Sequence, residues 1–264
     1  MNYQKIIMEA LPVIRETGRF LRREITKVGQ QDIETKQAHD YVTYVDKTSE
    51  QQLVKGLKKI LPNAGFLTEE KTILQDRGDL FWIIDPLDGT TNYIHQLPPY
   101  SISVALVSEN NLVGGIVYEV SHDELFYAWK NGGAFLNGKQ IRTSATSNFS
   151  ESFYATGFPF RDYSYINPYM DLLKYFMEHT QGLRRLGSAA VDLVYTACGR
   201  FDGFFEYSLA PWDVAGGAII LQEAGGIVSD FSGNNNFLYG EEIIAGNPHL
   251  HSQILEIIKR YIQH

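Results

Sequence analysis

Residues 82 to 93 read WIIDPLDGTTNY, and their pattern changes from apolar to polar within a few positions. The apolar residues Phe81 to Ile84 predict a strand that stops at Asp85, because the proline that follows has no backbone N–H for a sheet ladder. Gly89 and the two threonines after it predict the start of a helix. Two carboxylates, Asp85 and Asp88, would therefore lie beside backbone N–H groups that can hold a phosphate. The segment predicts a site for a metal-bound phosphate ester.

Length, composition and charge narrow the class of protein. A chain of 264 residues can form one large domain or two ordinary ones, and its 44% hydrophobic content is enough for a sizeable core. The net charge of −8 disfavours broad binding to nucleic acid or to an anionic membrane, so neither is expected as a partner. Cys198 is the only cysteine, which excludes a disulfide within the chain and favours a reducing cytoplasm. No apolar run approaches the roughly 18 residues needed to span a bilayer.

The first half of the chain is expected to combine helices with an antiparallel sheet. Apolar residues recur at helical spacing from Tyr3 to Ile25, which predicts an amphipathic helix packed on a core. The polar residues 28 to 41 predict a loop, and residues 42 to 46 a short strand or loop that positions Asp46. The other expected elements are a helix over 49–60 and strands over 65–68, 101–107, 112–120 and 124–129.

The second half alternates between strand and helix patterns, which predicts an α/β layer. Strands are expected over 152–156, 203–207, 226–229 and 242–245, and helices over 167–178, 188–198, 213–224 and 249–262. The Ser/Thr/Asn-rich residues 142 to 150 mark a soft boundary. We therefore expect an N-terminal half, 1–145, with the DPLDGTT motif and a C-terminal half, 146–264, with the WDVAGG motif, packed around a shared cleft.

Two further acidic segments accompany the first. Glu69 and Glu70 follow a predicted strand, where a carboxylate pair is usually a solvated turn. Asp213 lies in the segment PWDVAGG, where it can simply cap the next helix. Asp88 can also be a cap, but this explanation leaves Asp85 as an unpaired charge at a strand end. Taken together, the acids fit a pair of hard, oxygen-seeking cations such as Mg²⁺.

In a two-metal site, each of these acids can serve as a metal ligand. Asp85 could bridge the ions, with Glu69 completing one site and Asp88 with Asp213 the other. The backbone carbonyl of Leu87 lies between the two loop acids and could be a further ligand. An aspartyl-phosphate phosphatase would instead place its two acids two residues apart. The spacing of three found here favours direct attack by water over a covalent intermediate.

Several segments together resemble the inositol monophosphatases, a family of the lithium-sensitive, magnesium-dependent phosphatase superfamily. The matching pieces are TEE at 68–70, WIIDPLDGTTNY at 82–93 and APWDVAGGAIILQEAGG at 210–226, in the same order over almost the whole chain. ATGFPF at 155–160 and RRLGSAAVDL at 184–193 are similar to the bacterial inositol-1-monophosphatase branch. The resemblance implies an α+β or α/β fold, a layered α/β/α/β/α sandwich of the type shared with fructose-1,6-bisphosphatase.

The resemblance also implies metal ligands. Glu69, Asp85 and the Leu87 carbonyl would hold a first Mg²⁺. A second would be held by Asp85, Asp88 and Asp213. Glu69 would reach a weaker third ion through water, so that two to three Mg²⁺ ions occupy each active site.

Catalytic and phosphate-binding roles follow from the same resemblance. Glu69 and Thr90 would orient and help deprotonate the attacking water, and Asp46 would orient Thr90. The backbone N–H groups of Gly89 and Thr90 would hold phosphate oxygens. Glu70 would lie next to the metal ligands without itself binding a metal.

The alcohol portion of the substrate has its own implied residues. Asp88, Ala189, Glu206 and Asp213 would line its pocket, although the spacing around Glu206 fits a surface acid equally well. Lys36 resembles a family lysine near the metals, with the register off by about one residue.

The sequence allows more than one role for three basic residues near these motifs. His95 is expected to be a structural helix residue, because the mechanism needs no histidine. Arg184 and Arg185 fit a dimer surface, since the family is usually dimeric, or an exposed helix start.

The expected protein is therefore a cytoplasmic, homodimeric, lithium-sensitive hydrolase. It would convert inositol monophosphate to inositol and phosphate by in-line attack of a metal-activated water. Because the motif residues touch only phosphate and metal, the 2′-phosphate of NADP, a sugar phosphate, histidinol phosphate or a 3′-phosphonucleotide stays open as substrate. A non-catalytic regulatory or binding protein on the same fold is the alternative from another class.

Overall fold

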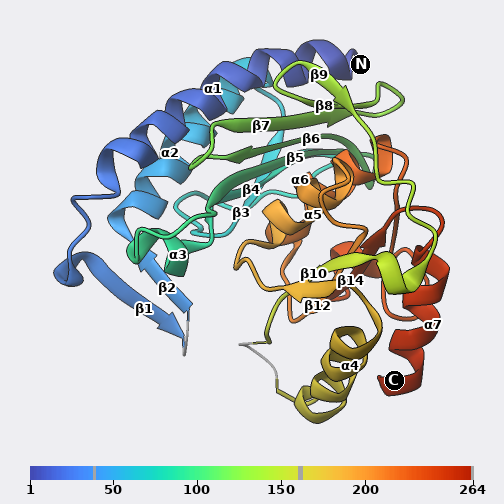
Figure 1. Ribbon diagram of the computed structural model, residues 1–264. Helices are drawn as coiled ribbons and strands as arrows, with labels where there is room; N and C mark the ends of the chain where they lie inside the picture. Colours follow the sequence, from blue (N-terminus) through green and yellow to red (C-terminus); the bar gives the residue numbers. More distant parts are fainter. Residues whose placement is uncertain (38–39, 160–162, 263–264) are drawn as a thin grey trace.

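The computed structural model describes residues 1–37, 40–159 and 163–262, and its elements stack in five layers. A seven-stranded sheet and a five-stranded sheet alternate with helices in the order α/β/α/β/α (Figure 1). Four hydrophobic clusters of described residues fill the spaces between successive layers. The layered sandwich expected from the sequence is confirmed.

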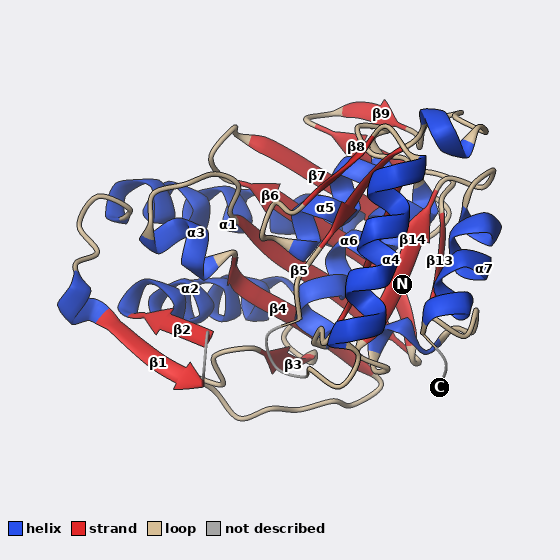
Figure 2. Cartoon of the chain, turned by 60° about the horizontal axis from the view of Figure 1, so that its bottom comes forward, coloured by secondary structure: helices blue, strands red, loops and turns tan. Residues whose placement is uncertain are grey.

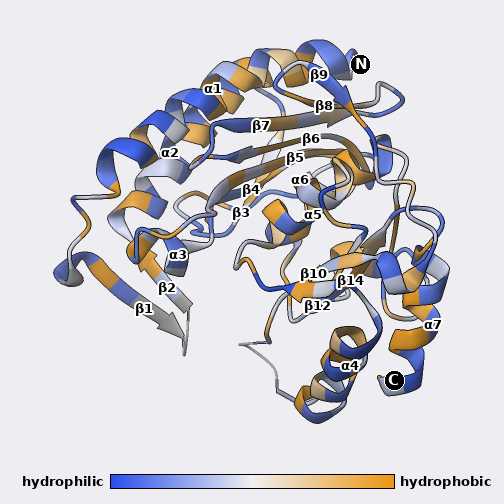
Figure 3. Cartoon of the chain, in the orientation of Figure 1, coloured by the Kyte–Doolittle hydropathy of each residue, from blue (hydrophilic) through white to orange (hydrophobic). Residues whose placement is uncertain are grey.

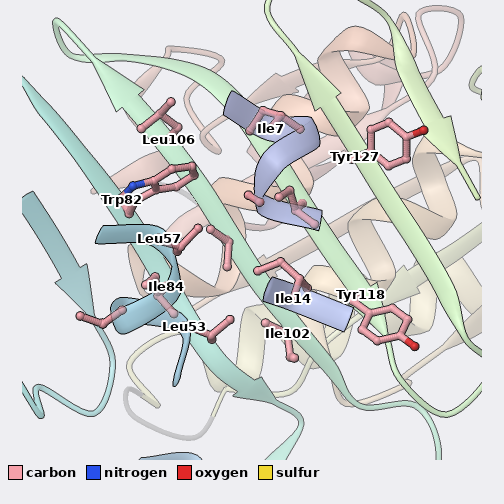
Figure 4. Packing of buried hydrophobic residues seen from close by; sticks show 14 of the residues in the cluster. Ile7, Ile14, Leu53, Leu57, Trp82, Ile84, Ile102, Leu106, Tyr118 and Tyr127 are labelled. Atoms are coloured by element: carbon pink, nitrogen blue, oxygen red, sulfur yellow. The ribbon is translucent and has the colours of Figure 1, made fainter. Parts of the chain in front are cut away.

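Helices α1 (Tyr3–Glu24) and α2 (Tyr44–Ile60) cover the outer face of the seven-stranded sheet. Helix α1 carries hydrophobic and hydrophilic stripes, as its periodicity predicts, and the Asn2 side chain caps its start (Figure 3). Figure 4 shows Ile7 and Leu57 among the buried side chains between helices and sheet. Burial of each such side chain contributes about 1.5–3 kcal/mol. The N-terminal helix is part of the core.

The seven-stranded sheet has the order β3-β4-β5-β6-β7-β8-β9 and is antiparallel except for its β3–β4 pair. Its strands are β3 (Gly65–Thr68), β4 (Leu80–Asp88), β5 (Ser101–Ser108), β6 (Asn111–Glu119), β7 (Glu124–Trp129), β8 (Ala134–Leu136) and β9 (Lys139–Ile141). Thr68 pairs with Ile84 in the parallel register. Because parallel strands end at the same edge of a sheet, this register brings Glu69 beside Asp85.

The five-stranded sheet is mixed, with the order β11-β10-β12-β14-β13. Its strands are β10 (Phe153–Thr156), β11 (Gly182–Arg184), β12 (Gly203–Tyr207), β13 (Ile227–Ser229) and β14 (Glu242–Gly246). Strand β10 runs parallel to β11 and β12, whereas β14 is antiparallel to β12 and β13. Helices α4 (Ile166–His179) and α7 (His251–Tyr261) cover its outer face.

Helices α5 (Ala189–Ala197) and α6 (Pro211–Glu223) lie between the two sheets. A Cβ at Gly217 would come within 2.5 Å of the Leu193 Cβ, and one at Gly216 within 2.7 Å of the Ser103 hydroxyl. The glycine pair of the WDVAGG motif therefore lets α6 approach both α5 and β5. This close packing fixes the start of α6, and with it Asp213, near the end of β4.

The structure corrects the loop predicted for residues 28 to 41, and of the strand or loop expected over 42–46 it shows a strand at Val42 and Thr43. In place of a loop, the described residues of this stretch form the 3₁₀ helix η1 (Gln30–Asp32) and two antiparallel strands, β1 (Ile33–Gln37) and β2 (Asp40–Thr43), set apart from the two larger sheets (Figure 2). Helix α2 begins at Tyr44, five residues before the expected start, because the Thr43 side chain caps it. Local capping at Thr43 therefore outweighs the weak apolar periodicity at the start of α2.

Residues from both expected halves build the central cluster. Strands β6 and β7 contribute to it together with α5, α6 and β12. The division at residues 145 and 146 falls between β9 and β10, near the 3₁₀ helix η2 (Phe149–Glu151), and stays a prediction. A further 3₁₀ helix, η3 (Asn236–Leu238), precedes β14. Within the described ranges, the helices lack the length and apolar character that a membrane span requires.

Candidate active site

A pocket of about 900 Å³ opens where β3, β4 and α6 meet. It collects residues from the three acidic segments of the sequence. The acids among its lining residues are Glu69, Asp85, Asp88 and Asp213, and the backbone of Leu87, Gly89 and Thr90 accompanies them. The structure thus places all the expected metal-binding and phosphate-binding residues around one space.

A bulge in β4 turns both motif acids toward this pocket. The register with β5 shifts between Asp85 and Asp88, and β4 continues to Asp88, so the predicted end of the strand at Asp85 is wrong. The two residues between the acids, one of them a proline, form the irregularity. The Leu87 N–H donates to Asp85 Oδ1 at 2.9 Å and fixes the Asp85 side chain, which is 2% exposed.

A glycine makes the corner between β4 and the short helix α3 (Thr90–Ile94). Gly89 has a φ of 91°, and a Cβ there would lie 3.2 Å from two carbonyl oxygens, those of Pro99 and Gly187. Because the first N–H groups of a helix have no partner within it, the N–H groups at this corner can face a ligand in the pocket.

The Thr90 hydroxyl is held from two sides. It lies 3.1 Å from Asp46 Oδ1 and 3.0 Å from the Leu87 carbonyl oxygen, to which it donates. Asp46 is itself fixed, since its Oδ2 accepts from the N–H and the hydroxyl of Thr43 at the start of α2. The Asp46 side chain is buried. Because Asp46 belongs to α2, its contact with Thr90 connects that helix to the DPLDGTT motif.

Glu50 organises the loop that carries Glu69. Its side chain is fully buried in α2, and its Oε2 accepts from the Glu70 N–H at 2.7 Å. Its Oε1 accepts from the N–H and the hydroxyl of Thr72. The Glu69 N–H donates to the Ile84 carbonyl at 3.2 Å. No motif in the sequence singled out Glu50, because its partners are about 20 residues away.

Asp213 lies in the first turn of α6 and is 9% exposed. Its Oδ2 accepts from the Ala210 N–H at 2.7 Å, so the capping role considered from sequence is present. Asp213 lines the pocket as well, and the two roles are compatible because a carboxylate has two oxygens.

The acids repel one another in this buried space. Burial raises the pKa of Asp85 well above its usual range, and the charges of Glu69, Asp88 and Asp213 add to the effect. Burial also raises the pKa of Asp88 to about 6, although hydrogen bonds from Ser188 and Ala190 oppose the shift. A site that concentrates negative charge in this way favours divalent cations.

The donor set fits Mg²⁺, since every expected ligand is an oxygen. Across the described residues, however, no three acidic, histidine or cysteine side chains lie close enough together to form a finished coordination shell. The acids share a pocket but hold hydrogen bonds to the protein, such as that from Leu87 to Asp85. Side-chain movement would be needed to complete a shell.

A second cavity, of about 70 Å³, adjoins the pocket and shares Asp88, Arg185, Gly187 and Asp213 with it. We call it the alcohol cavity; Gly157, Ser188, Ala189, Asp192, Glu206 and Leu209 are its other lining residues. All four expected substrate residues, Asp88, Ala189, Glu206 and Asp213, line this cavity. Asp88 Oδ2 accepts from the Ser188 hydroxyl at 2.5 Å and from the Ala190 N–H at 2.8 Å, which joins α5 to the motif.

Other predicted residues lie elsewhere or in new roles. Lys36 belongs to β1, and its side chain is outside the described part of the structure. Glu70 is absent from the lining of either cavity, while its N–H is bound by Glu50. His95, expected inside a helix, follows α3, is exposed and lines the larger pocket. Arg184 lies in β11, and Arg185 lines both cavities, so neither begins a helix.

Comparisons with known proteins agree with this fold and site. A family model described as "Inositol monophosphatase family" matches residues 2–263. The chain is 38% identical to "Nus factor SuhB" of Pseudomonas aeruginosa, covering 98% of this chain and 97% of that one. It is 39% identical to "Inositol-1-monophosphatase" of Rhizobium meliloti, covering 94% and 93%. The crystal structure of extragenic suppressor protein suhB from Bartonella henselae superposes with a TM-score of 0.91 at 36% identity, covering 99% and 100%.

The layered fold and the acidic pocket define a phosphatase. The chain belongs to the inositol monophosphatase family, since the family model spans nearly all of it.

Proposed function

We propose that this protein hydrolyses inositol monophosphate to inositol and phosphate and requires Mg²⁺. The observation that supports this most is the convergence of Glu69, Asp85, Asp88 and Asp213, from three distant segments, on one pocket beside the corner at Gly89. Such a pocket can offset the charge of a phosphate only when cations enter it.

The proposed metal ligands are the residues that the family resemblance implies. Glu69, Asp85 and the Leu87 carbonyl would hold one Mg²⁺, and Asp85, Asp88 and Asp213 another, with a weaker third near Glu69. When bound, Mg²⁺ would lower the pKa of a water molecule and neutralise charge on the phosphoryl oxygens. The carboxylates must be ionised to bind it, so the raised pKa values of Asp85 and Asp88 link metal affinity to pH.

The protein's own groups orient the reaction. The Thr90 hydroxyl has one proton, and its two neighbours, Asp46 Oδ1 and the Leu87 carbonyl oxygen, are both acceptors. The lone pairs of the hydroxyl oxygen therefore stay available to accept a hydrogen bond from a water in the pocket. In this proposal Glu69, which lines the same pocket, takes up a proton from that water. The N–H groups of Gly89 and Thr90 would hold phosphate oxygens during in-line attack.

The alcohol cavity receives the leaving group in this proposal. Glu206 is 6% exposed and its carboxylate can accept hydrogen bonds from hydroxyls of the substrate. Ala189 provides a small side chain beside it, which leaves room for a ring. The NADP 2′-phosphate, sugar phosphate, histidinol phosphate and 3′-phosphonucleotide alternatives present different groups to this cavity, so they can be separated by assay.

A phosphomonoester panel tests the proposal directly. We expect inorganic phosphate release from myo-inositol 1-phosphate in the presence of Mg²⁺, loss of release with EDTA, and inhibition by Li⁺. The Asp88→Asn variant should lose hydrolysis of all esters while keeping its fold by circular dichroism. Release that is faster from another ester would reassign the substrate, and release that persists in EDTA would refute the metal requirement.

The Pseudomonas aeruginosa relative bears the name Nus factor, which favours a second candidate function. In that case the chain would serve as a non-catalytic factor, alone or in addition to hydrolysis. The Asp88→Asn variant separates the two functions, because a non-catalytic role should survive the loss of hydrolysis. Complementation of a deletion strain by this variant would support the second function, and failure to complement would tie the phenotype to hydrolysis.

A further inference from the structure

We propose that Asp192 is a specificity residue of the alcohol cavity, where its carboxyl group forms a hydrogen bond with a hydroxyl group of the substrate alcohol. The inference rests on the proposed function, because it explains how the same site would select an ester of a polyol. Asp192 lies within the segment RRLGSAAVDL, but the resemblance implied no role for it.

An unpartnered buried oxygen is the first observation. Asp192 is 1% exposed, and its Oδ1 has no hydrogen-bond partner among the described residues. A buried acceptor left without a partner destabilises the folded state, because its hydrogen bonds to water are not replaced. Among the described residues, Asp192 is the one acid with such an oxygen. Asp202, by contrast, accepts from the Ser144 hydroxyl and from the Phe153 N–H. Asp192 is therefore an exception that a ligand could satisfy.

The position of Asp192 on α5 is the second observation. Asp192 follows Ala189 by three residues, so both side chains lie on the same face of the helix. Both line the alcohol cavity. A Cβ at Gly157 would come within 1.7 Å of Glu206 Oε1, so glycine there leaves the space that the Glu206 carboxylate occupies. Two acidic residues, Asp192 from α5 and Glu206 from β12, consequently line the same cavity.

The size and connection of the cavity match a hydroxylated group. Its volume of about 70 Å³ exceeds the roughly 15 Å³ that one water molecule needs. It shares Asp88, Arg185, Gly187 and Asp213 with the larger pocket, so an alcohol attached to a phosphate there can extend into it. An aryl or alkyl group would leave Asp192 Oδ1 unpaired, whereas a hydroxyl would pair it. The cavity would therefore prefer polyols.

Substitution with leucine tests this role, because leucine has a similar shape and no polar atom. In Asp192→Leu we expect kcat/KM for myo-inositol 1-phosphate to fall about tenfold, mainly through KM, with phenyl phosphate changed less than about twofold. The Tm should stay equal or rise, because an unpaired buried polar group is removed. Asp192→Asn, which keeps hydrogen-bonding atoms, should recover most of the lost activity.

Thr196→Val is the matched control. Thr196 lies one turn further along α5, is fully buried, and donates its hydroxyl to the Asp192 carbonyl oxygen without lining the cavity. It should leave the ratio of the two substrates unchanged. Equal losses for both esters in Asp192→Leu, or a fall in Tm with unchanged substrate preference, would show a merely structural role and overturn the proposal.

A binding measurement separates this inference from the proposed function. Free myo-inositol should raise the Tm of the wild-type protein and fail to raise that of Asp192→Leu. If inositol monophosphate is not hydrolysed but free inositol still binds through Asp192, the proposed function fails alone. If hydrolysis occurs and the variant binds inositol as the wild type does, the Asp192 proposal fails alone.

Discussion

The two walls of the site differ in how they are built. The acidic wall, formed by Glu69, Asp85, Asp88 and Asp213, comes from strand ends and one helix start that lie near sequence motifs. The alcohol wall, formed by Gly157, Ala189, Asp192, Glu206 and Leu209, comes from α5, β12 and the chain around them. The acidic wall would perform the same chemistry on any phosphate ester, whereas the alcohol wall would choose the ester. Changes in one wall should therefore affect all substrates, and changes in the other should affect some.

The largest effect is expected from Asp85, the most buried acid of the acidic wall. Asp85→Asn should lower kcat/KM by about 10³ for every phosphomonoester, since it removes a charge proposed to serve both metals. Without metal, the variant should have a higher Tm than the wild type, because the repulsion that raises the pKa of Asp85 is gone. Phosphate release and thermal melts in EDTA measure the two effects. A loss confined to inositol monophosphate would contradict the division between the walls.

Thr90 should show the next largest effect. Thr90→Val removes the hydroxyl that contacts Asp46 and the Leu87 carbonyl, and we expect kcat to fall about 10²-fold for all esters with little change in KM. Thr90→Ser keeps the hydroxyl and should retain most of the activity. Steady-state kinetics on inositol monophosphate and phenyl phosphate distinguish these variants. Equal activity of the valine and serine variants would remove Thr90 from the mechanism.

A smaller effect is expected from Glu50, which supports the acidic wall from behind. Glu50→Gln replaces one acceptor oxygen with an amide and loosens the Glu70–Thr72 loop. We expect activity at low Mg²⁺ to fall about tenfold and to recover largely at high Mg²⁺. Gln51→Ala, at the exposed neighbouring position, is the control. A Mg²⁺ titration of phosphate release that is identical for all three proteins would show that Glu50 does not position Glu69.

The smallest effect concerns pH and stability. The pKa of Asp88 is about 6 in the folded protein and about 3.9 in an unfolded chain, so the folded state takes up a proton first as the pH falls. Acidification from pH 7 to 5 should therefore stabilise the metal-free protein. Protonation of Asp88 alone should raise the Tm by a few degrees. Asp88→Asn should lack this component. Thermal melts in EDTA at both pH values measure it, and identical pH dependence in the two proteins would contradict the raised pKa.

The sequence anticipated the acidic wall because its residues follow strong local signals. The apolar run before Asp85 and a helix near Asp213 can be recognised from local sequence alone, although α6 begins at Pro211, two residues before the predicted start. The bulge that extends β4 to Asp88 was missed, because pairing with β5 continues past a proline that has no donor. The β1–β2 hairpin was missed because its residues are polar and lack alternation.

The residues that support the two walls could not be predicted from local sequence patterns. Glu50 acts on a loop about 20 residues away, and Ser188 bonds to Asp88 across about 100 residues of chain. Asp192 resembles any polar residue of a short helix until its missing partner and its cavity are known. Such roles depend on tertiary packing, which local patterns do not encode.

The central claim is that carboxylates from three segments hold divalent cations in one pocket. Anomalous diffraction from crystals soaked in Mn²⁺ tests it most directly, since Mn²⁺ prefers the same oxygen ligands as Mg²⁺ and scatters anomalously. The account predicts at least two peaks among Glu69, Asp85, Asp88 and Asp213, absent from crystals washed with EDTA. A pocket without peaks at millimolar Mn²⁺, in crystals of protein that still hydrolyses phosphate esters, would contradict it.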